Sequence, residues 1–130
     1  MKERMNMKLR TLILAISLVF GVSTSLFAQP AAVKKAADAA FTLTTFKADG
    51  SILATSNGVC ISTDGIAVSP WKPFIGADKA VIVDSKGQKH DVECLLGANE
   101  IYDIAKFQVS GKTAAAPLAT TVSAGDEVWL

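Results

Sequence analysis

The chain has 130 residues, of which 50% are hydrophobic and 19% are charged. This composition is typical of about one globular domain, and it excludes an intrinsically disordered chain, which combines low hydrophobicity with high net charge. The formal net charge of +1 provides no strongly basic surface, so no nucleic-acid partner is expected.

Residues 1–28 have the pattern of a secretory signal peptide. Four basic residues precede an uncharged apolar run at residues 11–26, and Ala28 follows as a cleavage position. A single membrane anchor is the alternative, but it needs about 20 apolar residues. We therefore expect export to the periplasm or the extracellular space and no membrane association after cleavage. The remaining 102 residues carry 9 basic and 11 acidic side chains.

After the expected cleavage site the pattern changes from alanine-rich to strand-like. Residues 29–40 predict a leader or short helix. Alternation of apolar and polar residues between turn residues then predicts strands at 41–47, 52–62, 66–69, 80–84, 90–97 and 104–110, with one more starting at 126. In the strand at 90–97, the alternation places Val92, Cys94 and Leu96 on one face. Pro70 and Pro73 interrupt the chain because proline lacks an N–H group.

These elements predict an all-β fold, an antiparallel barrel of six or seven strands over residues 41–130. Because the last predicted strand reaches only Leu130, we expect that the barrel is incomplete at its C-terminal end. Cys60 and Cys94 both lie in apolar stretches, so either a disulfide or two buried thiols fits the sequence. One histidine, His90, and the lack of a Cys/His cluster predict no metal site and no cofactor.

Four short motifs in order resemble the first barrel of trypsin-fold serine proteases of the HtrA/Deg type. They are SNGVCI at 56–61, DGIAVS at 64–69 followed by Gly76 and Ala77, DIAKFQV at 103–109, and GDEV at 125–128. The resemblance spans residues 56–130 and implies a two-barrel peptidase fold of which this chain carries the first barrel. It also implies that Asp103 stands at the position of the family's catalytic aspartate.

The same alignment places Lys72 where the family has its catalytic histidine. The triad needs an imidazole with a near-neutral pKa, which takes a proton from serine and returns it. An unperturbed lysine has a pKa of about 10.4, and a carboxylate beside it stabilises the charged form. His90 does not fill the role, because it lies on the strand after the turn at Lys86 and Gly87. We expect Lys72 and Asp103 within about 4–6 Å of each other, as a relic of the active site.

The family's serine nucleophile belongs to a second barrel that does not occur in these 130 residues. The resemblance therefore implies an exported pseudoprotease, or a fragment of one, with a binding or scaffold role toward a peptide or protein partner. Two alternatives remain: the N-terminal part of an active secreted serine endopeptidase with a rearranged base, and a stand-alone structural barrel. Trp71 and Phe74 are expected to pack in the core or at its rim, and lining a ligand groove is the alternative.

Overall fold

The computed structural model of the chain describes residues 30–128. The predicted signal peptide and the last two residues of the chain lie outside this range. The described part contains a short helix, α2 (Ala31–Asp38), a 3-10 helix, η1 (Lys72–Phe74), and strands β1 (Ala40–Phe46), β2 (Ile52–Cys60), β3 (Ile66–Ser69), β4 (Lys79–Asp84), β5 (Lys89–Asn99) and β6 (Ile104–Val109). No helix in this part is long and apolar enough to cross a membrane.

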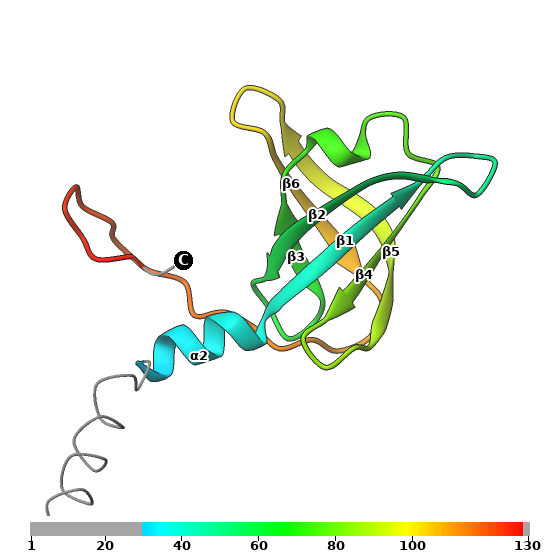
Figure 1. Ribbon diagram of the computed structural model, residues 1–130. Coiled ribbons are helices and arrows are strands. Elements are labelled where there is room, and N and C mark those ends of the chain that lie inside the picture. Colours follow the sequence, from blue (N-terminus) through cyan, green and yellow to red (C-terminus); the bar gives the residue numbers. More distant parts are fainter. Residues whose placement is uncertain (1–29, 129–130) are drawn as a thin grey trace, which may run out of the picture. The chain divides into compact units, whose positions relative to one another are not determined.

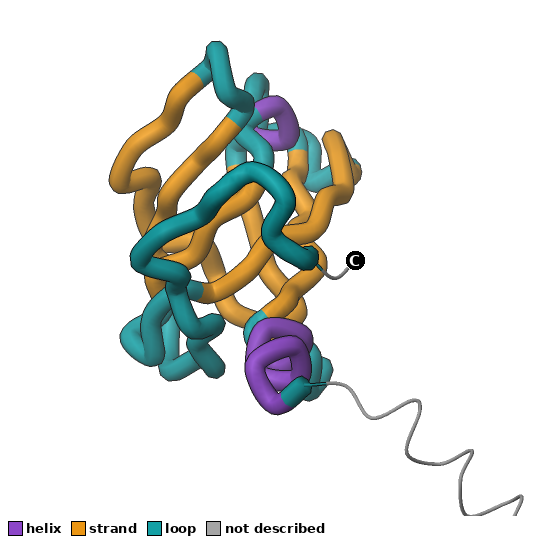
Figure 2. Tube along the Cα trace, turned by 90° about the vertical axis from the view of Figure 1, so that its left-hand side faces the viewer, coloured by secondary structure: helices purple, strands orange, loops and turns teal. Residues whose placement is uncertain are grey.

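The six strands form a closed antiparallel barrel in the order β1-β2-β3-β6-β5-β4 (Figure 1). β1 closes it by pairing with β2 on one side and with β4 on the other, for example Leu43 with Ser56 and with Ile82. Figure 2 shows the strands curving around a shared interior, with loops at both ends. The prediction of an all-β barrel is therefore confirmed, with the lower of the two expected strand numbers.

Most predicted strands lie within one or two residues of the observed ones. Residues 126–128 form no strand, although a seventh was expected to begin there, and the whole segment 110–128 lacks regular structure. The barrel closes without this segment, since all its strand pairs fall within residues 40–109.

The predicted faces of β5 are wrong beyond its first residues. The β5–β6 register shifts between Val92 and Cys94 and again between Leu95 and Gly97. A β-bulge adds one unpaired residue, which reverses the inside–outside alternation of everything that follows. Val92 packs against the core, whereas Cys94 and Leu96 are exposed. Leu95 pairs with the inward-facing Phe107 and is nevertheless exposed, so residues 93–99 of β5 are exposed on both faces.

The core lies inside the barrel and follows the alternation of β1. Phe41, Leu43 and Thr45 point inward and are almost fully buried, while the residues between them are not. Phe107 on β6 is the largest fully buried side chain, and its ring meets the edge or face of two other phenylalanines. The β6 strand is therefore anchored at the centre of the core, which positions the residue just before it, Asp103.

Candidate functional site

The segment after β3 folds into the short helix η1 at one end of the barrel, opposite the end that carries α2 (Figure 1). Pro73 fits the first turn of this helix, where an N–H group has no helical partner. The carbonyl of Pro73 accepts a 2.7 Å hydrogen bond from the buried hydroxyl of Thr45 on β1. This bond and the burial of Phe74 hold η1 against the barrel, so residue 72 has a defined place.

Asp103 lies beside this helix because the chain turns sharply before β6. Its backbone has a φ of 53°, in the left-handed region that aspartate tolerates better than most residues. Its carboxylate Oδ1 accepts hydrogen bonds from the backbone N–H of Lys72 at 2.8 Å and of Trp71 at 3.0 Å. The structure thus brings Asp103 and residue 72 together, although 30 residues separate them in the sequence.

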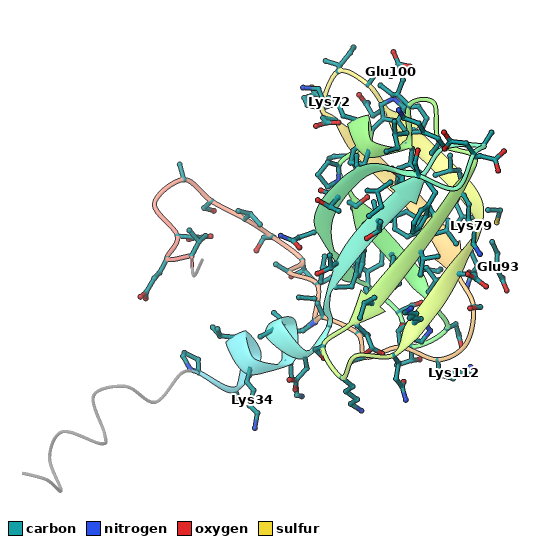
Figure 3. All side chains as sticks on the ribbon, turned by 45° about the vertical axis from the view of Figure 1, so that its right-hand side comes forward. Lys34, Lys72, Lys79, Glu93, Glu100 and Lys112 are labelled. Carbon is teal, nitrogen blue, oxygen red and sulfur yellow. The ribbon has the colours of Figure 1, made fainter. Side chains whose placement is uncertain are left out.

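The contact between the two positions runs through the backbone and not through an ion pair. Lys72 is exposed, and its ammonium takes part in none of the salt bridges found among residues 30–128. Figure 3 shows Lys72 and Glu100 at one end of the barrel and Lys112 at the other. The two residues are in contact, as expected, and the contact that the structure shows is a carboxylate that caps the first N–H groups of η1.

Phe74 is buried in the core, and Trp71 is partly buried and packs against it. Phe74 is 9% exposed and contacts Phe107, with ring centroids 5.2 Å apart. Trp71 stacks on Phe74 at 6.2 Å with an interplanar angle of 17°. Among the described residues, the indole Nε1 of Trp71 is the buried side-chain polar atom that has no hydrogen-bond partner. Of the two expected roles for these rings, packing is therefore the observed one.

Large apolar side chains next to both positions are turned to solvent. Ile75 follows η1 and is 60% exposed, and Tyr102 and Ile101, just before Asp103, are 74% and 90% exposed. Water contact of such side chains costs free energy, and burial of apolar surface of this kind is typical of contacts with a partner. This end of the barrel combines a fixed polar contact with apolar side chains that have no partner within residues 30–128.

The two cysteines have different surroundings and are both free. Cys60 is 2% exposed, and burial raises the pKa of its thiol above the usual value, while contact with Thr113 acts in the opposite direction. Cys94 is exposed on β5. The sequence left open a disulfide or two buried thiols. The structure shows neither: Cys60 is a buried free thiol and Cys94 is an exposed free thiol.

A thiol reagent is expected to distinguish them, because only an accessible thiolate reacts readily. In the native protein, Ellman's reagent is expected to modify one thiol quickly and the second only after denaturation. The variant Cys94→Ser is expected to lose the fast phase. Absence of any reaction in denatured, unreduced protein would instead indicate a disulfide.

Sequence reasoning missed the second polar cluster of the barrel. His90 on β5 is 6% exposed, and its Nε2 lies 3.0 Å from Oδ2 of Asp84 at the end of β4. Its Nδ1 lies 2.7 Å from the carbonyl oxygen of Ser110. The two side chains flank the turn at residues 85–88, and a hairpin prediction could have placed them near each other. The sequence does not predict the burial of His90, because charged residues, Lys89 and Asp91, flank it.

Neither cluster has the composition of a metal centre. Within residues 30–128, no three His, Cys, Asp or Glu side chains gather closely enough to hold a metal ion. The described chemistry is therefore a capped helix at one end of the barrel and a histidine–carboxylate pair at the other. The sequence matches no model of a known protein family, and no curated protein is similar to it.

Proposed function

We propose that the protein is an exported homologue of trypsin-fold serine proteases of the HtrA/Deg type that has lost catalysis and serves as a binding or scaffold domain. One observation carries the proposal: Oδ1 of Asp103 lies 2.8 Å from the backbone nitrogen of Lys72. The motif alignment predicted that these two positions meet. The closed six-stranded barrel is consistent with the implied fold.

Lys72 supports the loss of catalysis in this proposal. Its side chain is exposed and carries no imidazole, the group that takes and returns the serine proton in the triad. The carboxylate of Asp103 is also already used by two backbone N–H groups, so it orients η1 and not the side chain at position 72.

The exposed apolar side chains support the binding role. Ile75, Ile101 and Tyr102 lie next to the two aligned positions in the chain. A partner that covers them removes apolar surface from water, at roughly 25 cal/mol per Å². An unfolded or extended polypeptide, which exposes apolar side chains of its own, provides such surface.

The test uses the protein expressed from its complete reading frame and fluorescein-labelled casein as the polypeptide probe. Anisotropy measures binding and the release of labelled fragments measures cleavage in the same sample. The proposal predicts binding without cleavage. It also predicts weaker binding by a variant with Ile101→Ser and Tyr102→Ser, at an unchanged melting temperature, because both side chains are exposed.

Each alternative predicts a different outcome of this experiment. Cleavage of casein that disappears in Asp103→Ala would support an active secreted endopeptidase and overturn the proposed loss of catalysis. A lack of both binding and cleavage would support a stand-alone structural barrel. The variant Lys47→Ala serves as a control, because Lys47 is an exposed residue in the β1–β2 turn.

A further inference from the structure

The environment of His90 defines its protonation state. Both ring nitrogens face acceptors: Nε2 faces the carboxylate of Asp84 at 3.0 Å, and Nδ1 faces the carbonyl oxygen of Ser110 at 2.7 Å. A neutral imidazole has one N–H donor and one acceptor nitrogen, so it satisfies only one of these partners. The imidazolium ion has two donors and satisfies both.

We propose that Asp84, His90 and Ser110 form a pH-dependent clasp that fastens the segment after β6 to the barrel when His90 is protonated and loosens it when His90 is neutral. This inference is independent of the proposed protease ancestry. Asp84 ends β4, His90 lies on β5, and Ser110 follows β6, so the clasp joins three separate strands. When His90 loses one of its two ring protons, one of the two acceptor oxygens faces a nitrogen lone pair of the imidazole and has no donor.

The clasp is shielded from water, so a change in the protonation of His90 has a large effect on the energy of its hydrogen bonds. The side chains of His90 and Asp84 are only 7% and 14% exposed. Desolvation makes an unpaired polar group costly, and the screening that weakens surface pairs acts less here. By contrast, the Lys79–Asp91 pair on the neighbouring surface is 62% and 68% exposed, and it lies at 3.7 Å.

The groups around the clasp favour the charged form of His90. Asp84 is the carboxylate in direct contact, and the backbone N–H groups of Lys86 and Gln88 hold its other oxygen. The remaining charged groups lie beside Asp84 around a cavity of about 250 Å³, to which β2 contributes the buried thiol of Cys60. They are Asp38, Lys86 and Lys112. Lys112 is paired with Asp64, and so its charge is partly compensated.

The pKa directions agree with this geometry. The hydrogen bond to Asp84 raises the pKa of His90 above its ordinary 6.5, although burial acts in the opposite direction. Burial alone would raise the pKa of Asp84, but hydrogen bonds from His90, Gln88 and Lys86 lower it below 3.8. His90 therefore contributes stability that is fully present below pH 6.5 and is lost as the pH rises through its raised pKa. Asp84 contributes stability that is lost at more acidic pH.

The segment that the clasp holds is also attached to the barrel by other polar contacts, among them the hydroxyl of Thr113, which donates to the carbonyl oxygen of Ser62 at 2.8 Å, and the Lys112–Asp64 ion pair. Gly111 has a φ of 78° and passes so close to His90 that an added Cβ would lie 3.4 Å from Nδ1. Beyond it, the N–H of Thr113 donates to Thr63 at 3.1 Å and that of Ala116 donates to Cys60 at 2.9 Å. In the proposed clasp, protonation of His90 adds to these contacts in holding residues 111–116 against the barrel.

Nuclear magnetic resonance tests the clasp directly, because His90 is the sole histidine of the sequence. We expect the ring nitrogens of the native full chain to titrate with a pKa above 6.5, and both to be protonated at pH 6. The variant Asp84→Asn is expected to shift that pKa downward. A neutral ring at pH 6, or a pKa at or below 6.5, would overturn the proposal.

Hydrogen exchange tests the release of the segment. Between pH 5.5 and pH 8.5, after correction for the intrinsic exchange rate, the amide protons of Thr113 and Ala116 are expected to lose protection, and those of the β1–β4 ladder are not. His90→Gln is expected to abolish this pH dependence, while the control Asp91→Asn on the exposed pair leaves it intact. If His90→Gln does not fold, the wild-type titration still decides. Equal protection of Thr113 and Ala116 at both pH values would contradict the clasp.

Discussion

Replacing Phe107 with alanine is expected to lower the free energy of unfolding by about 3–5 kcal/mol, the range for removal of a buried aromatic ring. Phe107 is 0% exposed, and its ring centroid lies 6.0 Å from that of Phe41 and 5.2 Å from that of Phe74. The rings come from β1, β6 and η1, so the cavity left by the substitution would be shared by three elements that cannot all close on it. Urea unfolding followed by circular dichroism measures the loss.

The matched control is Phe46→Ala on β1. Phe46 is half-buried and alternates with the inward-facing residues of its strand, so it lies on the outside of the barrel. A loss of about 1 kcal/mol is expected there. Equal effects of the two substitutions would contradict the placement of the core inside the barrel.

Replacing Asp103 with alanine is expected to destabilise the domain by about 2 kcal/mol, since hydrogen bonds to a charged group contribute about 1.5–3 kcal/mol. The substitution removes the acceptor of the Trp71 and Lys72 N–H groups. It also places alanine at a φ of 53°, which aspartate and asparagine tolerate better. Thermal unfolding measures the loss as a lower melting temperature.

Two further variants show whether the backbone N–H or the side chain of Lys72 contributes to stability through Asp103. Asp103→Asn keeps an acceptor oxygen and is expected to recover most of the lost stability. Lys72→Ala is expected to change stability by less than about 0.5 kcal/mol, because its ammonium forms no ion pair in the described part of the chain. A large effect of Lys72→Ala would indicate a side-chain pair with Asp103 and contradict the backbone contact.

The barrel was predictable because its strands are short and separated by turn residues with clear preferences. Gly65 and Gly87, for example, both adopt positive φ values in turns that the sequence predicts. The bulges of β5 were not predictable, since a bulge depends on how two strands pair and not on the pattern of either strand alone. They place Cys94 on the face opposite to that of Val92, in a part of β5, residues 93–99, that is exposed throughout.

The candidate site was predictable in its residues but not in its chemistry. The motif alignment brought Asp103 and position 72 together. The charges of the two side chains suggested an ion pair, whereas in the structure the carboxylate of Asp103 accepts a hydrogen bond from the backbone N–H of Lys72. The preference arises because η1 leaves N–H groups without partners, which the carboxylate satisfies at short range. The sequence places His90 only on the strand that follows a turn. Its burial between the Asp84 carboxylate and the Ser110 carbonyl depends on the pairing of strands in the folded barrel.

The reaction of the complete protein with a serine-directed fluorophosphonate tests the proposed loss of catalysis most directly. Such a reagent forms a covalent adduct only with a serine that a neighbouring base activates. The proposed alignment puts Lys72 at the position of the base, so intact-mass spectrometry is expected to show no adduct. A stoichiometric adduct that is lost in Asp103→Ala would contradict the account and establish an active serine hydrolase.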